Sequence, residues 1–181
     1  MRKIVAGLFV SLDSVTESPE TWAMQFHDDE VLQTLAATLE NKDTLLLGRR
    51  TFEEFAAFWP NQSPDSDPFA GFINDTPKVV VSTTLGEPEW QPTTVVRSLD
   101  DVRALKEKPG NDIGMTGSVT LTRSLLKEGL LDQLGVLIHP VVLGSGKHLF
   151  DDVTSRIPLR VVDSKTFKTG VVSVTYAPAS A

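Results

Sequence analysis

The sequence has no cysteine, and histidine, which occurs three times, is also scarce. Without cysteine the chain has no disulfide framework, no thiolate metal site and no cysteine nucleophile. The absence fits a reducing cytoplasm, and we therefore expect a cytoplasmic protein.

Positive charge is also in short supply. The chain has 17 Lys and Arg against 24 Asp and Glu, which gives a formal net charge of −7. A general nucleic-acid binder normally carries a basic face, so we expect no nucleic-acid partner. No apolar run approaches the roughly 20 residues that a membrane span needs, so we expect no membrane partner either. A few local cations and backbone amides still suffice to bind a small anion.

The N-terminus begins with two cations and an apolar stretch, as a signal peptide would. Ser11-Leu12-Asp13 follows at once without a small-residue cleavage site, so residues 3–10 are better interpreted as a first β-strand. The composition, 40% hydrophobic and 23% charged, is ordinary for a globular protein. A chain of 181 residues can bury a sizeable core, and we expect a single domain over 1–181.

Apolar β-branched runs alternate with helical patterns along the chain. Further strands are predicted at 44–47, 78–82, 93–97, 112–115 and 133–143, the last interrupted or ended near Pro140. Helices are predicted at 28–41, after Gly48, after Ser98 and at 118–128, with Ser98 and Asp101 in a capping-box-like start. Residues 60–77 are rich in Pro, Asn, Ser and Asp and predict a loop with little regular structure.

The C-terminal part changes character. Two β-rich runs at 159–167 and 171–177 are separated by Lys168-Thr169-Gly170, which predicts a hairpin. Repeated βα units followed by such a hairpin predict an α/β fold of three layers. Its mostly parallel mixed sheet is flanked by helices and ends in a C-terminal antiparallel hairpin.

Two glycine turns are candidates for an anion site. In the first, a buried strand ends in Gly48, two arginines follow, and a helix begins at once. Helix amides attract anions, glycine allows close approach, and arginine grips a phosphate with two hydrogen bonds. The second turn, around Gly117, also joins a strand to a helix. Ligands of open α/β sheets bind at the carboxyl ends of strands, where both turns lie. The alternative for the first turn is that its arginines only face the solvent. The alternative for the second turn is that it is a plain glycine-containing connector without a ligand.

Other motifs are absent or incomplete. There is no G-x-G-x-x-G after the first strand and no G-x-S-x-G elbow. The run 144–148, GSGKH, lacks the leading glycine of a P-loop and has histidine after its lysine. His27, His139 and His148 show no metal-ligand spacing, so we expect no metal site.

Four segments together resemble the dihydrofolate-reductase-like superfamily, and most closely the reductase domain of bacterial riboflavin biosynthesis and its single-domain relatives. They are SLD at 11–13, LGRRTFE at 47–53, KVVVSTT at 78–84, and the stretch from TGS at 116–118 to PVVLGSGKHLF at 140–150. The resemblance implies a dihydrofolate-reductase-like fold and an NADPH-dependent oxidoreductase. The implied reaction is hydride transfer to a small heterocyclic substrate, similar to that of 5-amino-6-(5-phosphoribosylamino)uracil reductase.

The resemblance also implies an NADPH site without a metal. Gly48, Arg49, Arg50 and Thr51 match the turn that meets the cofactor phosphates. Ser82 and Thr83 match positions near the adenosine 2′-phosphate. The turn under the pyrophosphate and nicotinamide ribose corresponds to four residues, Gly117, Ser118, Val119 and Thr120.

The chain departs from the family pattern in three places. Ser14 follows Asp13 where the family usually has glycine, and Met115-Thr116 precedes Gly117 where small residues are common. We also expect no zinc deaminase domain, which often accompanies the riboflavin reductase, within these residues, because they contain none of its cysteine ligands.

Several side chains are candidates for contact with the substrate. Asp13 follows the strand expected beside the nicotinamide and is a candidate substrate-orienting or proton-handling group, with a turn or cap role as the alternative. Asp29 and Glu30 are rival carboxylates, although acids in a first helical turn commonly serve the helix dipole. Trp22 and Phe55 have the shape to stack on a flat ring, although aromatic residues at helical spacing commonly belong to a core.

Two other functions stay open. A non-catalytic NADPH-binding or ligand-binding regulatory protein would be indicated by a destroyed cofactor turn, and both turns are intact. A dihydrofolate reductase expects an acid on the first helix facing the pteridine, and 28–30 lie near without a clean match. Relatives of this architecture resemble homodimers, and the apolar run 134–143 is either an interface strand or a central one.

Overall fold

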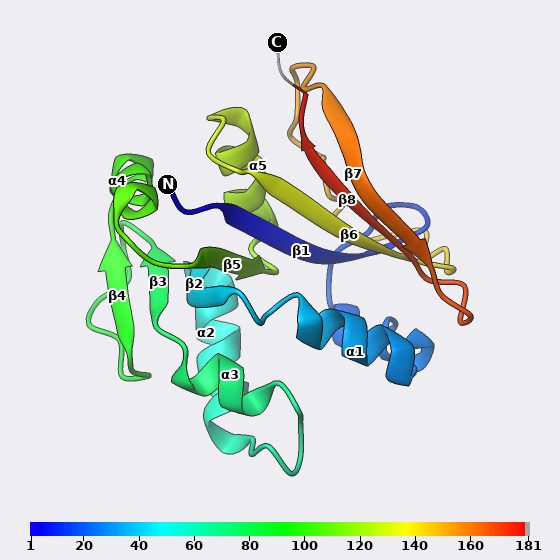
Figure 1. Ribbon diagram of the computed structural model, residues 1–181, viewed down its shortest axis with the longest axis horizontal. Helices are drawn as coiled ribbons and strands as arrows, with labels where there is room; N and C mark the ends of the chain where they lie inside the picture. The colour runs from blue at the N-terminus through cyan, green and yellow to red at the C-terminus, as the bar shows by residue number, and fades with distance from the viewer. Residues whose placement is uncertain (180–181) are drawn as a thin grey trace.

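The computed structural model describes residues 1–179 and contains one eight-stranded sheet of order β4-β3-β2-β5-β1-β6-β8-β7 (Figure 1). Neighbours from β4 to β6 pair in parallel, whereas β8 pairs antiparallel to both β6 and β7. The strands are β1 (Ile4–Ser11), β2 (Lys42–Gly48), β3 (Lys78–Val81), β4 (Thr93–Val96), β5 (Asp112–Thr116), β6 (Gln133–His139), β7 (Leu159–Thr166) and β8 (Val172–Pro178). The predicted mostly parallel mixed sheet with a C-terminal antiparallel hairpin is confirmed.

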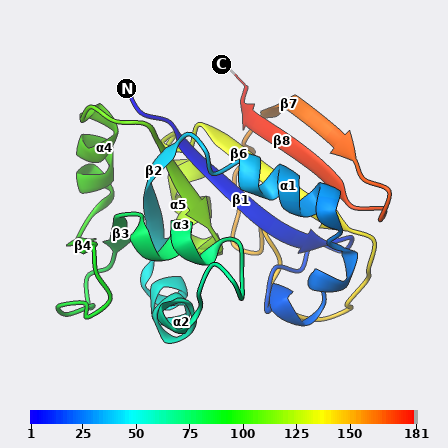
Figure 2. The same ribbon diagram turned by 60° about the horizontal axis from the view of Figure 1, so that its bottom comes forward.

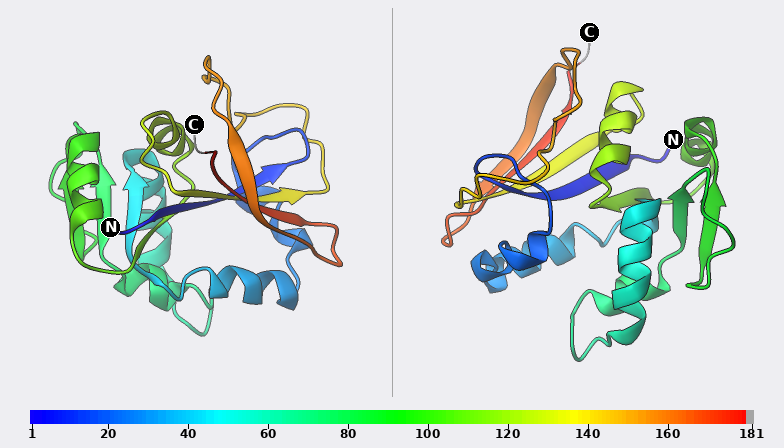
Figure 3. Two further views of the ribbon diagram at one scale, coloured as in Figure 1. Left: turned by 45° about the horizontal axis from the view of Figure 1, so that its top comes forward. Right: turned by 180° about the vertical axis from the view of Figure 1, so that it is seen from behind.

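Helices cover both faces of the sheet, as the two views of Figure 3 show. One face carries α1 (Asp29–Ala37), α2 (Arg49–Phe58) and α3 (Ala70–Asp75), and the other carries α4 (Leu99–Glu107) and α5 (Val119–Lys127). Three 3₁₀ turns, at Pro19–Thr21, Met24–Phe26 and Trp59–Asn61, lie in the connections. None of the helices in 1–179 is long and apolar enough to cross a membrane.

The buried side chains form one main core and two smaller clusters. The main core fills the space between the sheet and the α4/α5 layer. On the opposite face, α1 packs over β1 and β6 through Val31, Phe9 and Leu137. Farther along the same face, α2 packs over β2 and β3 through Phe52 and its neighbours. Figure 2 shows the same division, with α1 alongside β1 and β6 and α2 beside the other half of the sheet.

Most predicted elements are present, with shorter ends. The capping box at the start of α4 is formed, because Ser98 Oγ accepts from Asp101 N–H while the Asp101 carboxylate accepts from Ser98 N–H. The predicted helix 28–41 ends at Ala37, and the predicted strand 133–143 ends at His139, before Pro140. The prediction of a loop through 60–77 was wrong in one part, because Ala70–Asp75 form α3 and bury Ala70 and Ile73. Pro60, Pro64 and Pro68 precede this short helix and led to the prediction of a loop.

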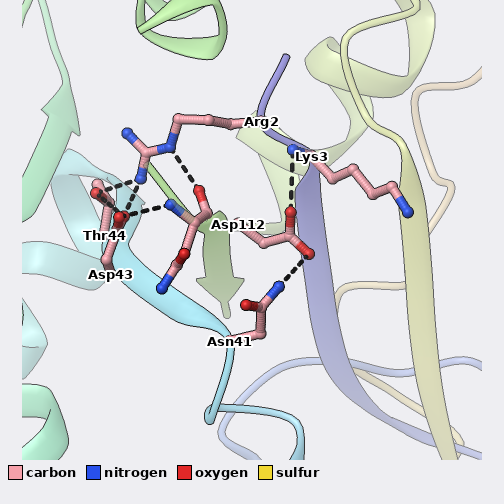
Figure 4. A network of polar contacts seen from close by, with 7 residues as sticks. Arg2, Lys3, Asn41, Asp43, Thr44 and Asp112 are labelled. Atoms are coloured by element: carbon pink, nitrogen blue, oxygen red, sulfur yellow. Dashed lines mark hydrogen bonds and ion pairs between the residues drawn. The ribbon is translucent and has the colours of Figure 1, made fainter. Parts of the chain in front are cut away.

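A polar network ties the N-terminus to the amino ends of β2 and β5 (Figure 4). The buried Arg2 guanidinium donates to Asn111 O at 2.6 Å, to Thr44 Oγ1 at 2.8 Å and to the Asp43 carboxylate. Asp112 accepts from Lys3 N–H at 3.2 Å. This network lies at the end of the sheet opposite the two glycine turns.

Candidate functional site

The two predicted glycine turns touch each other at the carboxyl ends of the neighbouring strands β2 and β5. Gly48 N–H donates to Ser118 Oγ at 2.9 Å. Ser118 N–H donates in return to Thr51 Oγ1 at 3.0 Å. Each turn therefore fixes the position of the other, and the N-termini of α2 and α5 are held side by side.

The second turn has a backbone that favours small residues. Gly117 has φ +60° and Ser118 has φ 49°, so two successive residues lie in the left-handed region. A Cβ at Gly117 would lie 3.0 Å from Thr51 Cγ2. Glycine is therefore required both for the backbone conformation and for the contact with the first turn.

Both helix N-termini keep backbone amides available. Within the described residues neither α2 nor α5 has a side-chain cap. Arg49 makes a two-oxygen ion pair with Glu53, at 2.9 and 3.0 Å from its Nη1, and Arg50 is exposed beside it. Two N-termini with two arginines form an electropositive surface that suits a phosphate.

The end of β3 extends this surface. Val81 pairs with Gly48 on one side and with Val96 on the other, so Ser82 follows directly beside the first turn. Ser82 is buried, and its Oγ accepts from the amides of Thr84 and Leu85, whereas Thr83 is exposed.

Arg97, which sequence reasoning missed, lies at the end of β4. Its Nη1 donates to the carbonyls of Ser82 and Leu85, both at 2.8 Å. The sequence signal that could have found Arg97 is its position directly after a strand. Arg49, which follows β2, was found by the same signal.

A bare patch of sheet lies next to the second turn. The pairing of β1 with β5 ends at Gly7 and Thr116, while β1 continues along β6 to Ser11. Gly7 lies on the α1/α2 face, as does Phe9, and a Cβ at Gly7 would meet only Met115 O, at 3.9 Å. Sequence reasoning missed this patch, although a glycine inside a strand often marks a close approach to the backbone.

Asp13 is tied into the loop that follows β6. Its carboxylate accepts from Ser11 Oγ at 2.6 Å, from Gly144 N–H at 2.8 Å and from Leu143 N–H at 3.2 Å. These hydrogen bonds, the one from Ser11 first, lower the pKa of Asp13 from 3.8 to about 2. Asp13 is therefore an ionised group that positions the 143–144 segment, and a proton-donor role at neutral pH is disfavoured.

A shallow hollow of about 270 Å³ lies between the segment after Asp13 and the loop after β6. Its lining is formed by Val15, Glu17, Ser18, Thr21, Trp22, Leu143, Ser145 and Gly146. Trp22 is 7% exposed, and its Nε1 donates to Glu17 O at 2.9 Å. The structure thus places Trp22 with Asp13 in one region.

The other two predicted substrate residues lie apart from this region. Asp29 is exposed in the first turn of α1, where Asp28 is the N-cap and accepts from Val31 N–H at 3.0 Å. Phe55 is half-buried against the α2 cluster and meets the ring of Trp59 at 6.0 Å. These positions favour the helix-dipole and core alternatives for the two residues.

Two histidines meet although 112 positions separate them. His27 Nε2 lies 3.0 Å from His139 Nε2, beside the carboxyl ends of β1 and β6. No local pattern in the sequence links the two residues. His148, the third histidine, instead lies 3.2 Å from the Asp151 carboxylate.

A mostly parallel sheet of this strand order, with its helices and closing hairpin, defines the dihydrofolate-reductase-like class of α/β proteins. The chain belongs to the RibD C-terminal domain family, whose sequence profile matches residues 2–173. It is 34% identical to the uncharacterized protein YyaP of Bacillus subtilis (strain 168), over 97% of this chain and 94% of that protein.

Two solved structures show the likeness of fold. A protein from Shewanella sp. PV-4, whose name assigns it provisionally to riboflavin biosynthesis, superposes with a TM-score of 0.77 at 23% identity, over 99% of this chain and 100% of that one. Dihydrofolate reductase from Enterococcus faecalis, complexed with NADP(H) and RAB-propyl, gives a TM-score of 0.68 at 15% identity, over 98% and 97% of the two chains.

Proposed function

We propose that this protein is an NADPH-dependent reductase that transfers hydride to a small heterocyclic substrate. The observation that carries the proposal is the interlocked pair of turns, in which two uncapped helix N-termini and two arginines meet at the carboxyl ends of β2 and β5. Membership in the RibD C-terminal domain family supports a reductase, and the complex of the E. faecalis structure supports the choice of cofactor.

The residues present fit NADPH on structural grounds. Gly117 lets the backbone of the second turn lie close to Thr51, and the amides of Val119 and Thr120 that follow at the start of α5 would hold the pyrophosphate. Arg49, Arg50 and Thr51 would hold phosphate oxygens at the start of α2. Ser82 and Thr83, with Arg97 beside them, would hold the 2′-phosphate that distinguishes NADPH from NADH.

The chain itself would supply orientation and a fixed electrostatic environment. When bound, NADPH supplies the hydride. The bare strand at Gly7 offers a flat surface against which two planar rings can stack, next to the second turn. Asp13 would hold the 143–144 segment at the edge of this surface, and Trp22 would present its buried ring at the adjoining hollow.

The first test is a titration with NADPH and with NADH at moderate salt, followed by nicotinamide fluorescence. We expect saturation with NADPH and a Kd for NADH at least about tenfold weaker, which corresponds to roughly 1.4 kcal/mol for the 2′-phosphate contacts. Arg97→Met should narrow this difference, while Arg103→Met on the outer face of α4 should not. Absence of binding by either nucleotide would contradict the reductase proposal.

Turnover is tested with NADPH and 5-amino-6-(5-phosphoribosylamino)uracil, followed by the loss of nicotinamide absorbance. Dihydrofolate is the comparison substrate. Faster oxidation with the aminopyrimidine phosphate would support the riboflavin-type substrate class, and faster oxidation with dihydrofolate would favour the folate-type alternative.

Asp13→Asn should leave the NADPH Kd unchanged and slow turnover, because the amide presents a donor where the Gly144 N–H also donates. Unchanged turnover would remove Asp13 from the mechanism. The same variant should have a lower Tm at pH 7. The lowered pKa means that the carboxylate stabilises the fold above pH 3.8 and loses this contribution as the pH falls toward 2. The Tm difference between wild type and variant should therefore shrink on acidification, as checked by thermal unfolding from pH 7 to pH 3.

A further inference from the structure

His27 and His139 form a contact pair outside the residues used so far. His139 is 0% exposed at the end of β6, where it is surrounded by the rings of Phe9, Trp22 and Phe26 at 5.3 to 6.0 Å. His27 is half-buried just before α1, and its Nε2 lies 3.0 Å from His139 Nε2. A buried polar contact between two imidazoles requires one ring to donate and the other to accept.

The carbonyls around His139 decide which ring donates. His139 Nδ1 lies 3.0 Å from Leu137 O and 3.2 Å from Val10 O, and carbonyl oxygens only accept. His139 therefore carries its proton on Nδ1. Burial lowers the pKa of His139, although the two carbonyls oppose this, so its Nε2 keeps a free lone pair. That lone pair accepts a hydrogen bond from His27 Nε2–H.

This arrangement leaves His27 Nδ1 as the nitrogen of the pair that exchanges a proton. With Nε2–H of His27 committed to His139, protons enter and leave His27 at Nδ1. Among the described residues, the groups that influence this titration are His139, packed from β6, and Asp28, at the start of α1. Burial first, and then His139, lowers the pKa of His27, while Asp28 opposes the shift. The Phe9 ring that packs on it from β1 is uncharged.

The pair lies on the same face of the sheet as the bare patch. The His27 ring meets the edge of Phe9 at a centroid distance of 5.1 Å. Phe9 and Gly7 lie on the same face of β1, two residues apart, which corresponds to about 7 Å along a strand. Phe9 therefore places the His27 ring on the face of β1 against which the substrate ring is proposed to stack.

We propose that His27 is the proton donor of the reduction and that His139 is its positioning residue. This inference rests on the proposed function. The substrate C=N or C=O carbon gains the hydride of NADPH, which becomes NADP⁺, and its nitrogen or oxygen gains the proton from His27 Nδ1. The carbon–heteroatom π bond is thereby lost, and neutral His27 takes a new proton from solvent at its exposed side. His139 fixes the orientation of the His27 ring and does not itself lose or gain a proton.

The first experiment observes the pair without any turnover. Long-range ¹H–¹⁵N spectra of the imidazoles can resolve the three histidines of the chain, with His27→Gln and His148→Gln for assignment. We expect neutral His139 to be the Nδ1–H tautomer. His27 should be an Nε2–H tautomer when neutral and should gain its proton at Nδ1. A His27 that carries its neutral proton on Nδ1 would overturn the proposal.

The second experiment measures turnover of the aminopyrimidine phosphate with NADPH. In wild type, kcat should fall as the pH rises through the pKa of His27 in the complex. His27→Gln keeps a donor toward His139 but carries no titrating proton, so kcat at pH 7 should fall about 100-fold and lose this pH dependence. The NADPH Kd should stay within about twofold.

The His139 variants separate positioning from folding. His139→Gln retains an acceptor for His27 and should keep the pH dependence of kcat. His139→Leu should remove this pH dependence and leave the NADPH Kd unchanged. Absent wild-type turnover would contradict the proposed function itself, before any variant is made. Normal turnover by His27→Gln in the presence of wild-type activity would contradict only the assignment of His27.

Discussion

Gly7→Leu is expected to abolish most of the activity and to leave the fold intact. A Cβ at this position meets only Met115 O, at 3.9 Å, which is an ordinary van der Waals contact. The leucine side chain therefore extends over the bare patch without a steric clash at its Cβ. Leucine would fill the surface on which the nicotinamide and the substrate ring are proposed to stack. We expect kcat/KM with the aminopyrimidine phosphate to fall on the order of 100-fold, which corresponds to about 2.7 kcal/mol.

Two matched variants make this result interpretable. Gly7→Ala adds one methyl group and should cost less than about tenfold, so the loss should increase with side-chain size. Gly71→Leu makes the same replacement on α3, where a Cβ has an ordinary contact with Pro64 at 3.7 Å, and should leave turnover unchanged. The Tm of all three variants checks folding. Wild-type turnover by a folded Gly7→Leu protein would place the reaction elsewhere.

The fold was predictable because its signals are local. Each parallel strand is a short apolar run, and glycine or a capping residue begins the next helix, as at Gly48 and Ser98. The strand order was not predicted, because right-handed βαβ connections fix the side of each crossover and not which strands become neighbours. The helix α3 was missed because the prolines around it outweighed a short apolar pattern, whose buried residues are Ala70 and Ile73.

Part of the candidate site was also predictable from local signals, and part depends on tertiary contacts. The two glycine turns follow strands directly, so the sequence alone placed Gly48 and Gly117 at one edge of the sheet. Their mutual hydrogen bonds through Ser118 depend on β2 and β5 being neighbours, although 70 positions separate the bonded residues. The His27–His139 contact depends on how the segment before α1 folds over β6, and no periodicity encodes it. The bare surface at Gly7 likewise depends on strand pairing, which places Gly135 of β6 beside Gly7.

Arg2→Met is expected to give the largest loss of stability outside the site. The Arg2 side chain is 6% exposed, and it satisfies Asn111 O, Thr44 Oγ1 and the Asp43 carboxylate at once. Removing one partner of a buried ion pair typically costs 3–5 kcal/mol. Asp43 is 40% exposed and keeps its hydrogen bond from Asn111 N–H, so we expect about 3 kcal/mol. For a chain of this size that loss lowers Tm by roughly 6–12 °C.

Arg103→Met is the control for this loss, because Arg103 pairs with Asp100 at 3.8 Å on the surface, where the two side chains are 52% and 93% exposed. An exposed pair of this kind contributes at most about 1 kcal/mol, so Tm should change by no more than about 4 °C. Asp43→Asn, alone and combined with Arg2→Met, completes a double-mutant cycle that isolates the coupling between the two charges. Equal Tm shifts for the Arg2 and Arg103 variants would show that the network at the amino ends of β2 and β5 contributes no more than a surface pair. The expected inequality follows from burial, since the carbonyl of Asn111 and the hydroxyl of Thr44 lose their donor with Arg2, whereas water replaces Arg103 at Asp100.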